Sequence, residues 1–156
     1  MEIIKTSAFE KLKIRPVNVC DLKMDSNWSN MWVDPNKMNW RDLVAGDVLK
    51  TDCKPTEVTP NIWIAFDLVD MKRLFGTRYS HTCGGLVRIN VKPRIRASFS
   101  LLSHYYSSWP KYSTSKPTDF DVVSVWKTGF DISNIFTYDD LFEFYKEHNL
   151  FDLCKY

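Results

Sequence analysis

Hydrophobic and polar residues alternate without interruption between Val87 and Leu101. Four of the polar residues are basic: Arg88, Lys92, Arg94 and Arg96. Successive side chains of a β-strand point to opposite faces. The pattern therefore predicts an extended segment with a basic face and an aliphatic face that another layer must cover. Pro93 falls in the apolar phase, so either one strand bends there or two strands meet without loss of phase.

Four other segments have the composition of β-strands. They are residues 12–19, 47–50, 62–66 and 121–127. Pro16 cannot donate a ladder hydrogen bond, so the first should be an edge or bulged strand. Gly46 supplies a tight bend before the second. The third is almost continuously apolar, which is typical of a central strand buried on both faces.

Two helices are predicted from their capping residues. Asp67, with Asp70 three residues later, is an N-cap pattern for a short helix that Gly76 ends. Thr137 and Asp140 form a capping-box pattern before a C-terminal helix. No series of alternating strands and helices indicates a parallel doubly wound sheet.

These elements predict the α+β class. We expect a single globular domain over residues 1–156, with a largely antiparallel sheet of about five strands covered by the C-terminal helix and one short helix. A length of 156 residues is usual for one domain and allows a sizeable core.

Residues 21–42 are unusually rich in Trp and Met. Trp28 and Trp32 stand four residues apart and would share the face of a helix, and Trp40 follows a turn signalled by residues 34–36. The rings either lie over the core as a lid or form a surface that docks on another protein, because Trp and Met side chains adapt well to a partner. We call residues 28–40 the Trp/Met segment.

Composition limits the classes of function. The chain is 44% hydrophobic and 26% charged, which is close to the globular average, and its net charge of +2 is too small to require a polyanionic partner. The aromatic share of 15% is high. Most of these rings should be core, but Trp and Tyr left on a surface mark binding sites.

Cysteine usage and hydropathy indicate a cytoplasmic protein without a cofactor. The thiols Cys20, Cys53, Cys83 and Cys154 are scattered without a C-x-x-C pair, so their spacing gives no support for a zinc site. The first fifteen residues carry charges throughout, which argues against a secretory signal. No apolar run approaches membrane-spanning length, so no membrane partner is expected.

Two features could bind nucleic acid. Side chains two apart on a strand face lie about 6 to 7 Å from each other, so the four basic residues of 88–96 could follow a phosphate backbone. The aromatic loop, residues 104–116, follows directly and mixes rings with cationic and hydroxyl groups. Its candidate binding residues are His104, Tyr105, Tyr106, Trp109, Lys111 and Tyr112. The alternatives are a solvated sheet face and rings that simply pack.

Evidence for catalysis is weaker, and we lean against an enzyme. The chain has three histidines, and His148 is explained by its place at a helix C-terminus. His81 and His104 could cleave a phosphodiester by acid/base catalysis with help from neighbouring groups. The candidates for that help are Lys111, Tyr105, Tyr106, Asp119 and Asp121. The paired H-x-T/S motif of two-histidine phosphoesterases is absent.

Three functions follow in order of preference. The first is a small binding or inhibitor protein that docks on another macromolecule through the Trp/Met segment and a basic sheet face rimmed by rings. The second is a nucleic-acid or nucleotide-binding module. The third is a metal-independent phosphodiesterase or RNase that uses His104. The expected partners are therefore another protein, a nucleic acid or a nucleotide.

Overall fold

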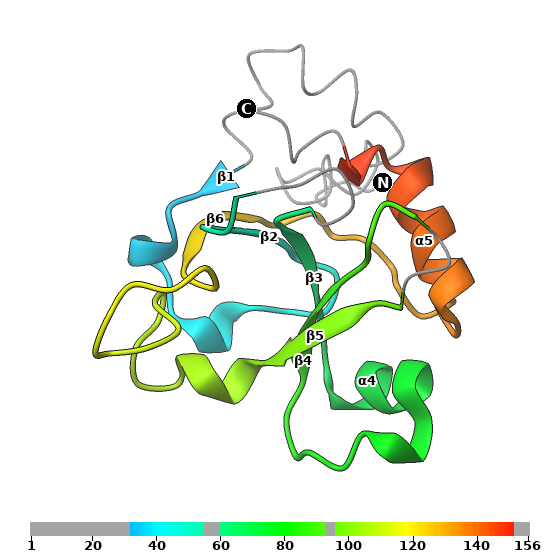
Figure 1. The fold of residues 1–156 in the computed structure, drawn as a ribbon, viewed down its shortest axis with the longest axis horizontal. Coiled ribbons are helices and arrows are strands. Elements are labelled where there is room, and N and C mark those ends of the chain that lie inside the picture. The colour runs from blue at the N-terminus through cyan, green and yellow to red at the C-terminus, as the bar shows by residue number, and fades with distance from the viewer. Residues whose placement is uncertain (1–31, 55–59, 93–95, 152–156) are drawn as a thin grey trace, which may run out of the picture.

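The computed structural model describes residues 32–54, 60–92 and 96–151, which form one six-stranded sheet with the two α-helices on one face (Figure 1). The strand order is β1-β6-β2-β3-β4-β5, and every neighbouring pair is antiparallel. The strands are β1 (Trp32–Val33), β2 (Val48–Thr51), β3 (Ile62–Phe66), β4 (Gly85–Arg88), β5 (Ser98–Leu101) and β6 (Val122–Trp126).

Two α-helices and four short 3-10 helices complete the described part of the chain. They are η2 (Pro35–Lys37), η3 (Trp40–Asp42), α4 (Leu68–Phe75), η4 (Gly76–Arg78), η5 (Leu102–Tyr105) and α5 (Tyr138–Glu147). Both α-helices begin with the predicted capping boxes, Asp67 with Asp70 and Thr137 with Asp140. The α+β class, the largely antiparallel sheet and its two helices are confirmed.

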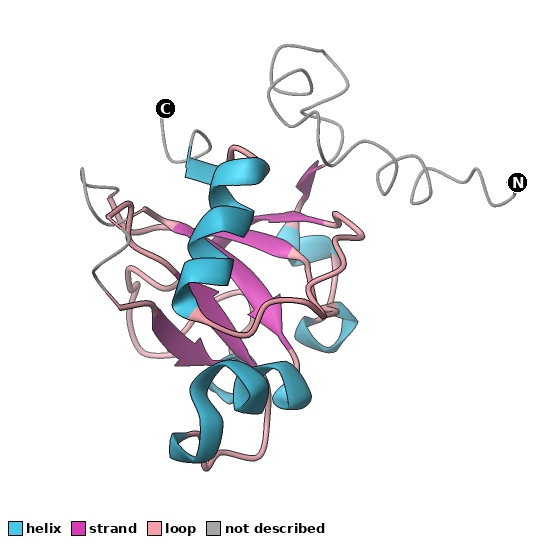
Figure 2. Cartoon of the chain, turned by 90° about the vertical axis from the view of Figure 1, so that its right-hand side faces the viewer, coloured by secondary structure: helices cyan, strands magenta, loops and turns pink. Residues whose placement is uncertain are grey.

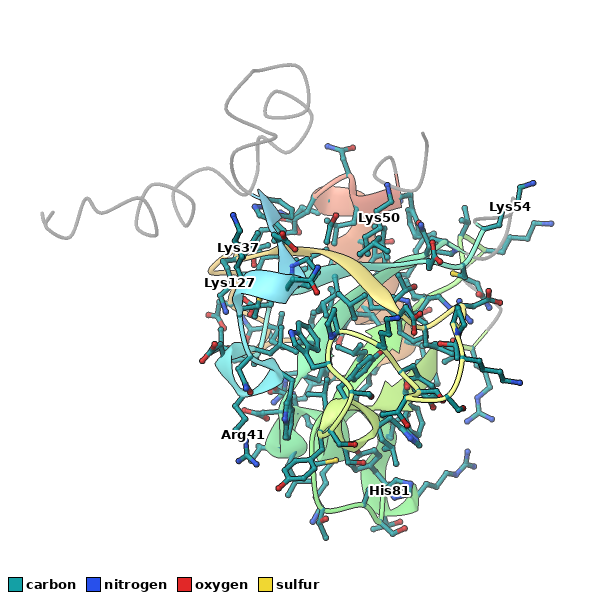
Figure 3. All side chains as sticks on the ribbon, turned by 90° about the vertical axis from the view of Figure 1, so that its left-hand side faces the viewer. Lys37, Arg41, Lys50, Lys54, His81 and Lys127 are labelled. Carbon is teal, nitrogen blue, oxygen red and sulfur yellow. The ribbon has the colours of Figure 1, made fainter. Side chains whose placement is uncertain are left out.

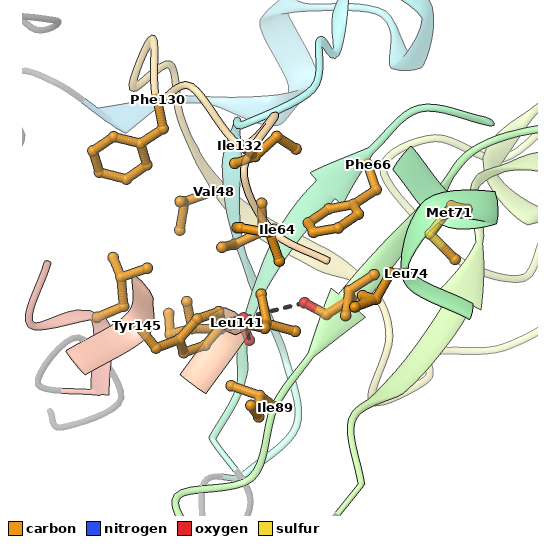
Figure 4. Packing of buried hydrophobic residues seen from close by; sticks show 14 of the residues in the cluster. Val48, Ile64, Phe66, Met71, Leu74, Ile89, Phe130, Ile132, Leu141 and Tyr145 are labelled. Atoms are coloured by element: carbon orange, nitrogen blue, oxygen red, sulfur yellow. Dashed lines mark hydrogen bonds between the residues drawn. The ribbon is translucent and has the colours of Figure 1, made fainter. Parts of the chain in front are cut away.

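The sheet separates two hydrophobic clusters, because its strand residues alternate between its faces. In β3, Ile62, Ile64 and Phe66 belong to one cluster, which α4 and α5 cover, while Trp63 and Ala65 belong to the other. All five are buried, as expected for a central strand. We call these the helix-side cluster (Figure 4) and the loop-side cluster. Figure 2 shows α5 lying across the strands.

The alternating segment contains two separate strands, β4 and β5, which pair with each other; Pro93, where the sequence left a bend or a junction of two strands open, lies outside the described residues. Strand β4 ends at Arg88 and pairs with β5, with Val87 opposite Phe99 and Arg88 opposite Ser98. The apolar residues before and after the connection still pack on the same side of the sheet. Val87, Ile89, Ala97 and Leu101 all belong to the helix-side cluster. A single extended strand over these fifteen residues is therefore wrong, although its aliphatic face is real.

Helix α5 is fixed to the sheet through its buried face. Leu141 and Tyr145 are fully buried there. The Tyr145 hydroxyl lies 3.2 Å from the carbonyl oxygen of Ile62 and 3.1 Å from that of Val87, where the pairing of β3 with β4 ends. This polar contact gives the buried Tyr145 hydroxyl a partner on the strands and fixes α5 to them.

Helix α4 is tied to the chain that precedes α5 by one arginine. The Arg73 guanidinium donates to the carbonyl oxygens of Ile135 and Ile132, each at 2.9 Å, and pairs with Asp70 at 2.8 Å. Charge-assisted bonds of this kind are stronger than neutral ones. The arginine therefore holds the two helical regions together.

Several predictions concern residues outside the described ranges. The strand at residues 12–19, Trp28 and Arg94 are among them. Trp32 lies in β1 opposite Trp126, so it does not share a helix face with another ring. Within the described ranges, every helix is too short or too polar to cross a bilayer.

Candidate docking surface

The second face of the sheet is covered by loops instead of α-helices. In Figure 1 these loops lie to the left, opposite α4 and α5. Tyr105, from η5, is fully buried in the loop-side cluster, and its hydroxyl donates to the carbonyl oxygen of Phe120 at 2.6 Å. Burial, followed by the nearby Tyr112 and Asp121, raises the pKa of Tyr105. Tyr105 is therefore a neutral core residue that positions the aromatic loop.

Trp109 joins the aromatic loop to the Trp/Met segment. Its indole nitrogen donates to the carbonyl oxygens of Pro35 at 2.8 Å and Met38 at 3.0 Å, and Pro35 and Trp109 are 74 residues apart in sequence. A buried indole needs such a partner. The two segments that the sequence singled out separately are thus side by side.

Beside this junction, two rings and a guanidinium form a small surface. The rings of Trp40 and Tyr106 meet edge to face with centroids 6.0 Å apart. The Arg41 guanidinium lies 5.1 Å from the Trp40 ring centroid and 5.2 Å from that of Tyr106. Tyr106 is 64% exposed and Arg41 is exposed, while Trp40 is partly buried. We call these three residues the Trp40 surface; Figure 3 shows the Arg41 side chain pointing away from the molecule.

The backbone under the Trp40 surface is held on both sides. Asn39 caps η3 by accepting from the backbone N–H of Arg41, and the Asp42 side chain accepts from that of Asn39. The Lys127 ammonium donates to the carbonyl oxygen of Asp42 at 2.7 Å and to the Asp47 carboxylate at 2.6 Å. The position of Arg41 is therefore largely set before any partner binds.

Asp47 is a buried charge that supports this region. Its side chain has no exposed surface, and it also accepts from the backbone N–H of Val44. Burial raises the pKa of Asp47, although the bonds from Lys127 and Val44 act in the opposite direction. The carboxylate consequently depends on Lys127 to remain charged inside the fold.

Three members of the predicted basic stripe, Arg88, Lys92 and Arg96, are described, and they do not share one surface; Arg94 lies outside the described residues. Arg88 is partly buried on the loop side, with its guanidinium 4.5 Å from the Trp63 ring centroid. Arg96 lies near Tyr138 of α5, at 5.7 Å, on the helix side. Lys92 is exposed in the hairpin connection between them. Lys92 and Arg96 lie outside β4 and β5, so strand alternation does not fix the direction of these two side chains.

The remaining loop candidates divide between core and surface. Tyr112 packs in the loop-side cluster, and the exposed His104 ring lies against it with centroids 4.6 Å apart. Lys111 is exposed. The Asp121 carboxylate accepts from the Tyr112 backbone and from Thr118, so it acts as a loop cap.

The two histidines predicted to act as an acid/base pair, His81 and His104, pack in different parts of the structure. His81 packs against Tyr79, which belongs to the helix-side cluster, whereas His104 packs against a residue of the loop-side cluster. Among the described residues, no group of three or more His, Cys, Asp or Glu side chains could hold a metal ion.

Comparison with family models, curated proteins and solved structures finds no match. The function must therefore be argued from the surfaces themselves. Arg41 is the member of the Trp40 surface that the sequence analysis missed. The Asn39–Asp42 spacing, which is a capping-box pattern, could have shown that Trp40 and Arg41 begin a helical turn.

Proposed function

We propose that this is a binding protein whose Trp40 surface docks on another protein. The observation that carries the proposal is the exposed Arg41 guanidinium held against two rings from segments that Trp109 joins. Trp, Tyr and Arg are the residues most enriched among interface hot spots. A surface whose backbone is already fixed loses less entropy on binding than a mobile one.

The chemistry of the surface indicates what the partner presents. The Arg41 guanidinium carbon lies over the Trp40 and Tyr106 rings, and guanidinium N–H groups are suited to bind a carboxylate in a fork geometry. The exposed Tyr106 ring offers apolar area beside that charge. The expected partner segment therefore carries an Asp, Glu or terminal carboxylate next to an apolar side chain.

The test compares immobilised full-length protein with its Arg41→Ala and Tyr106→Ala variants in lysate of the cell that makes it. Captured proteins are quantified by mass spectrometry after nuclease treatment. We expect one captured protein to be lost with both variants, because truncation of a hot-spot residue costs about 2 kcal/mol, or roughly thirtyfold in affinity.

The matched control is Phe136→Ala, which removes a ring of comparable exposure, 54% against 64% for Tyr106, outside the Trp40 surface. It should retain the partner. Hydrogen exchange of the purified complex should show protection at residues 34–42 and 102–112. Capture that is indifferent to Arg41 and Tyr106, or that nuclease abolishes, would reject docking of a protein at this surface.

A further inference from the structure

A second candidate site lies on the helix side, where the end of α4, β5 and the start of α5 meet. A cleft of about 290 Å³ opens there. It is lined by four aromatic rings and two guanidinium groups, from Phe75, Tyr79, Phe99, Tyr138, Arg78 and Arg96. We call it the arginine cleft. None of its residues belongs to the Trp40 surface.

The rings make a preformed apolar wall. The Phe75 ring is the centre of the group, with centroid distances of 4.7 Å to Phe99, 5.8 Å to Tyr138 and 6.4 Å to Tyr79. Phe99 is 39% exposed, although it is one of the larger apolar side chains. Such packing fixes the ring planes while leaving part of the Phe99 ring open to a flat molecule.

The two guanidiniums at the cleft differ from that of Arg73 in having no ion-pair partner among the described residues. Arg73 has a carboxylate and two carbonyls as partners. In residues 32–54, 60–92 and 96–151, neither Arg78 nor Arg96 has a carboxylate within ion-pair distance, and no acidic residue lines the cleft. Both side chains are exposed. They form a local positive site beside an aromatic wall.

Tyr79 belongs to the wall and not to the polar part of the site. Its hydroxyl donates to the carbonyl oxygen of Cys83 and lies 3.3 Å from that of Gly84. Burial, with a smaller effect from Cys83, raises the pKa of Tyr79 to about 12. The hydroxyl therefore stays protonated and occupied at neutral pH. The charged groups that a ligand meets are the two arginines.

We propose that the arginine cleft binds a nucleotide unit, with the base against the exposed Phe99 ring and the partly buried Tyr138 ring and the phosphate between Arg78 and Arg96. Stacking on aromatic rings accepts any base, and Arg is suited to bidentate phosphate contacts. The cleft volume is near the lower end of the range for small-molecule sites, about 300 to 1,000 Å³. It therefore suits one nucleotide and is too small for a dinucleotide cofactor.

A second cleft, also bordered by α5, is acidic and is therefore unfavourable for an anion. It has a volume of about 310 Å³ and is lined by Asp131, Asp140, Glu143 and Glu147 together with three uncharged residues. Helix α5 thus borders clefts of opposite charge. A phosphate is attracted to the first and repelled by the second, so nucleotide binding should be confined to the arginine cleft.

The proposal is tested with the full chain by calorimetry and by amide chemical shifts. The probes are AMP, UMP, adenosine and inorganic phosphate. We expect both nucleotides to bind, with adenosine and phosphate at least about tenfold weaker, because each makes only part of the contacts. Arg78→Ala and Arg96→Ala should each lower the affinity for AMP at least about tenfold. Phe99→Ala should lower the affinity for both AMP and adenosine.

Lys72→Ala is the matched control, since it removes an exposed cation of α4 that does not line the cleft. It should bind AMP like the natural chain. The removed side chains are exposed or partly so, and thermal unfolding of each variant checks that the fold is kept. Equal AMP binding by the natural chain, Arg96→Ala and Phe99→Ala, or no AMP binding at all, would overturn the proposal.

One further experiment distinguishes a free nucleotide from a nucleotide within a nucleic-acid strand as the natural ligand. A single-stranded oligoribonucleotide is compared with AMP at two salt concentrations. Tighter binding of the oligonucleotide, lost in Arg96→Ala and steeply reduced by salt, assigns the cleft to a nucleic-acid strand. Tighter binding of AMP assigns it to a free nucleotide. Oligonucleotide binding that survives Arg96→Ala would place nucleic acid elsewhere and contradict the proposal.

Discussion

The two faces of the sheet are covered in different ways. On the helix side, α4 and α5 begin with capping boxes and bury Met71, Leu74, Leu141 and Tyr145 in regular helical spacing. On the loop side, the cover consists of short turns whose rings are tied to backbone carbonyls, as at Tyr105 and Trp109. Helices satisfy their own backbone groups, whereas loops need side chains to do so.

This difference explains where the exposed features lie. The loop side can place rings and a guanidinium at the surface, because its residues are not bound to a repeating pattern. The helix side leaves a cleft where α4, β5 and α5 meet at their ends. Both candidate sites are therefore found where regular structure stops.

The largest predicted effect is on the core of the loop side. Tyr105→Ala should lower the free energy of unfolding by about 4 kcal/mol, and Leu141→Ala on the helix side by about 3 kcal/mol, because the larger side chain leaves the larger cavity. Urea denaturation measures both. A loss below about 1 kcal/mol for Tyr105→Ala would mean that the loop layer contributes little to the core.

The next largest effect is the loss of a cation that holds one of the two layers on the sheet. Lys127 does this on the loop side and Arg73 on the helix side. Lys127→Met leaves Asp47 fully buried without its ion-pair partner. Arg73→Met leaves Asp70 without its partner, but the Asp70 side chain is 10% exposed to water. We expect Lys127→Met to cost about 3 kcal/mol and Arg73→Met less, since breaking a buried pair leaves an uncompensated charge. Thermal and urea unfolding of both variants at neutral pH test this order.

The cost of Lys127→Met should depend on pH in a known direction. The pKa of Asp47 is already raised in the folded state, and removal of Lys127 raises it further. The folded protein then binds a proton more readily than the unfolded chain, so stability increases as pH falls through the folded pKa. The loss should be smaller at about pH 5 than at about pH 7. An equal loss at both values would show that Asp47 stays charged.

The smallest effect concerns the ends of the elements. Thr137→Ala removes the cap of α5, and Trp109→Phe removes the indole donor that joins the two loop segments. Each should cost about 1 kcal/mol. Only Trp109→Phe should also speed amide exchange at residues 34–42, since the helix side does not hold that segment. Similar amide exchange rates at residues 34–42 in both variants would contradict a separate role for the Trp109 hydrogen bonds.

The helix side could largely be predicted from the sequence. The Asp67 and Thr137 caps and the apolar β3 strand were each recognised from local spacing and occur as predicted. The loop side could not be predicted in this way, because Trp109 reaches the carbonyl of Pro35 across 74 residues. The basic stripe was mistaken for another reason: the strand ends at Arg88, and Arg96 lies on the opposite side of the sheet.

The sequence by itself determined the strand phase, the helix starts and therefore the α+β class. These depend on backbone geometry and hydrogen bonds between residues a few positions apart. Tertiary structure alone decided that Trp40, Arg41 and Tyr106 meet, and that Arg78 and Arg96 share a cleft without a carboxylate. Such contacts form between distant segments and depend on how side-chain volumes fill the space between layers, which no local pattern records.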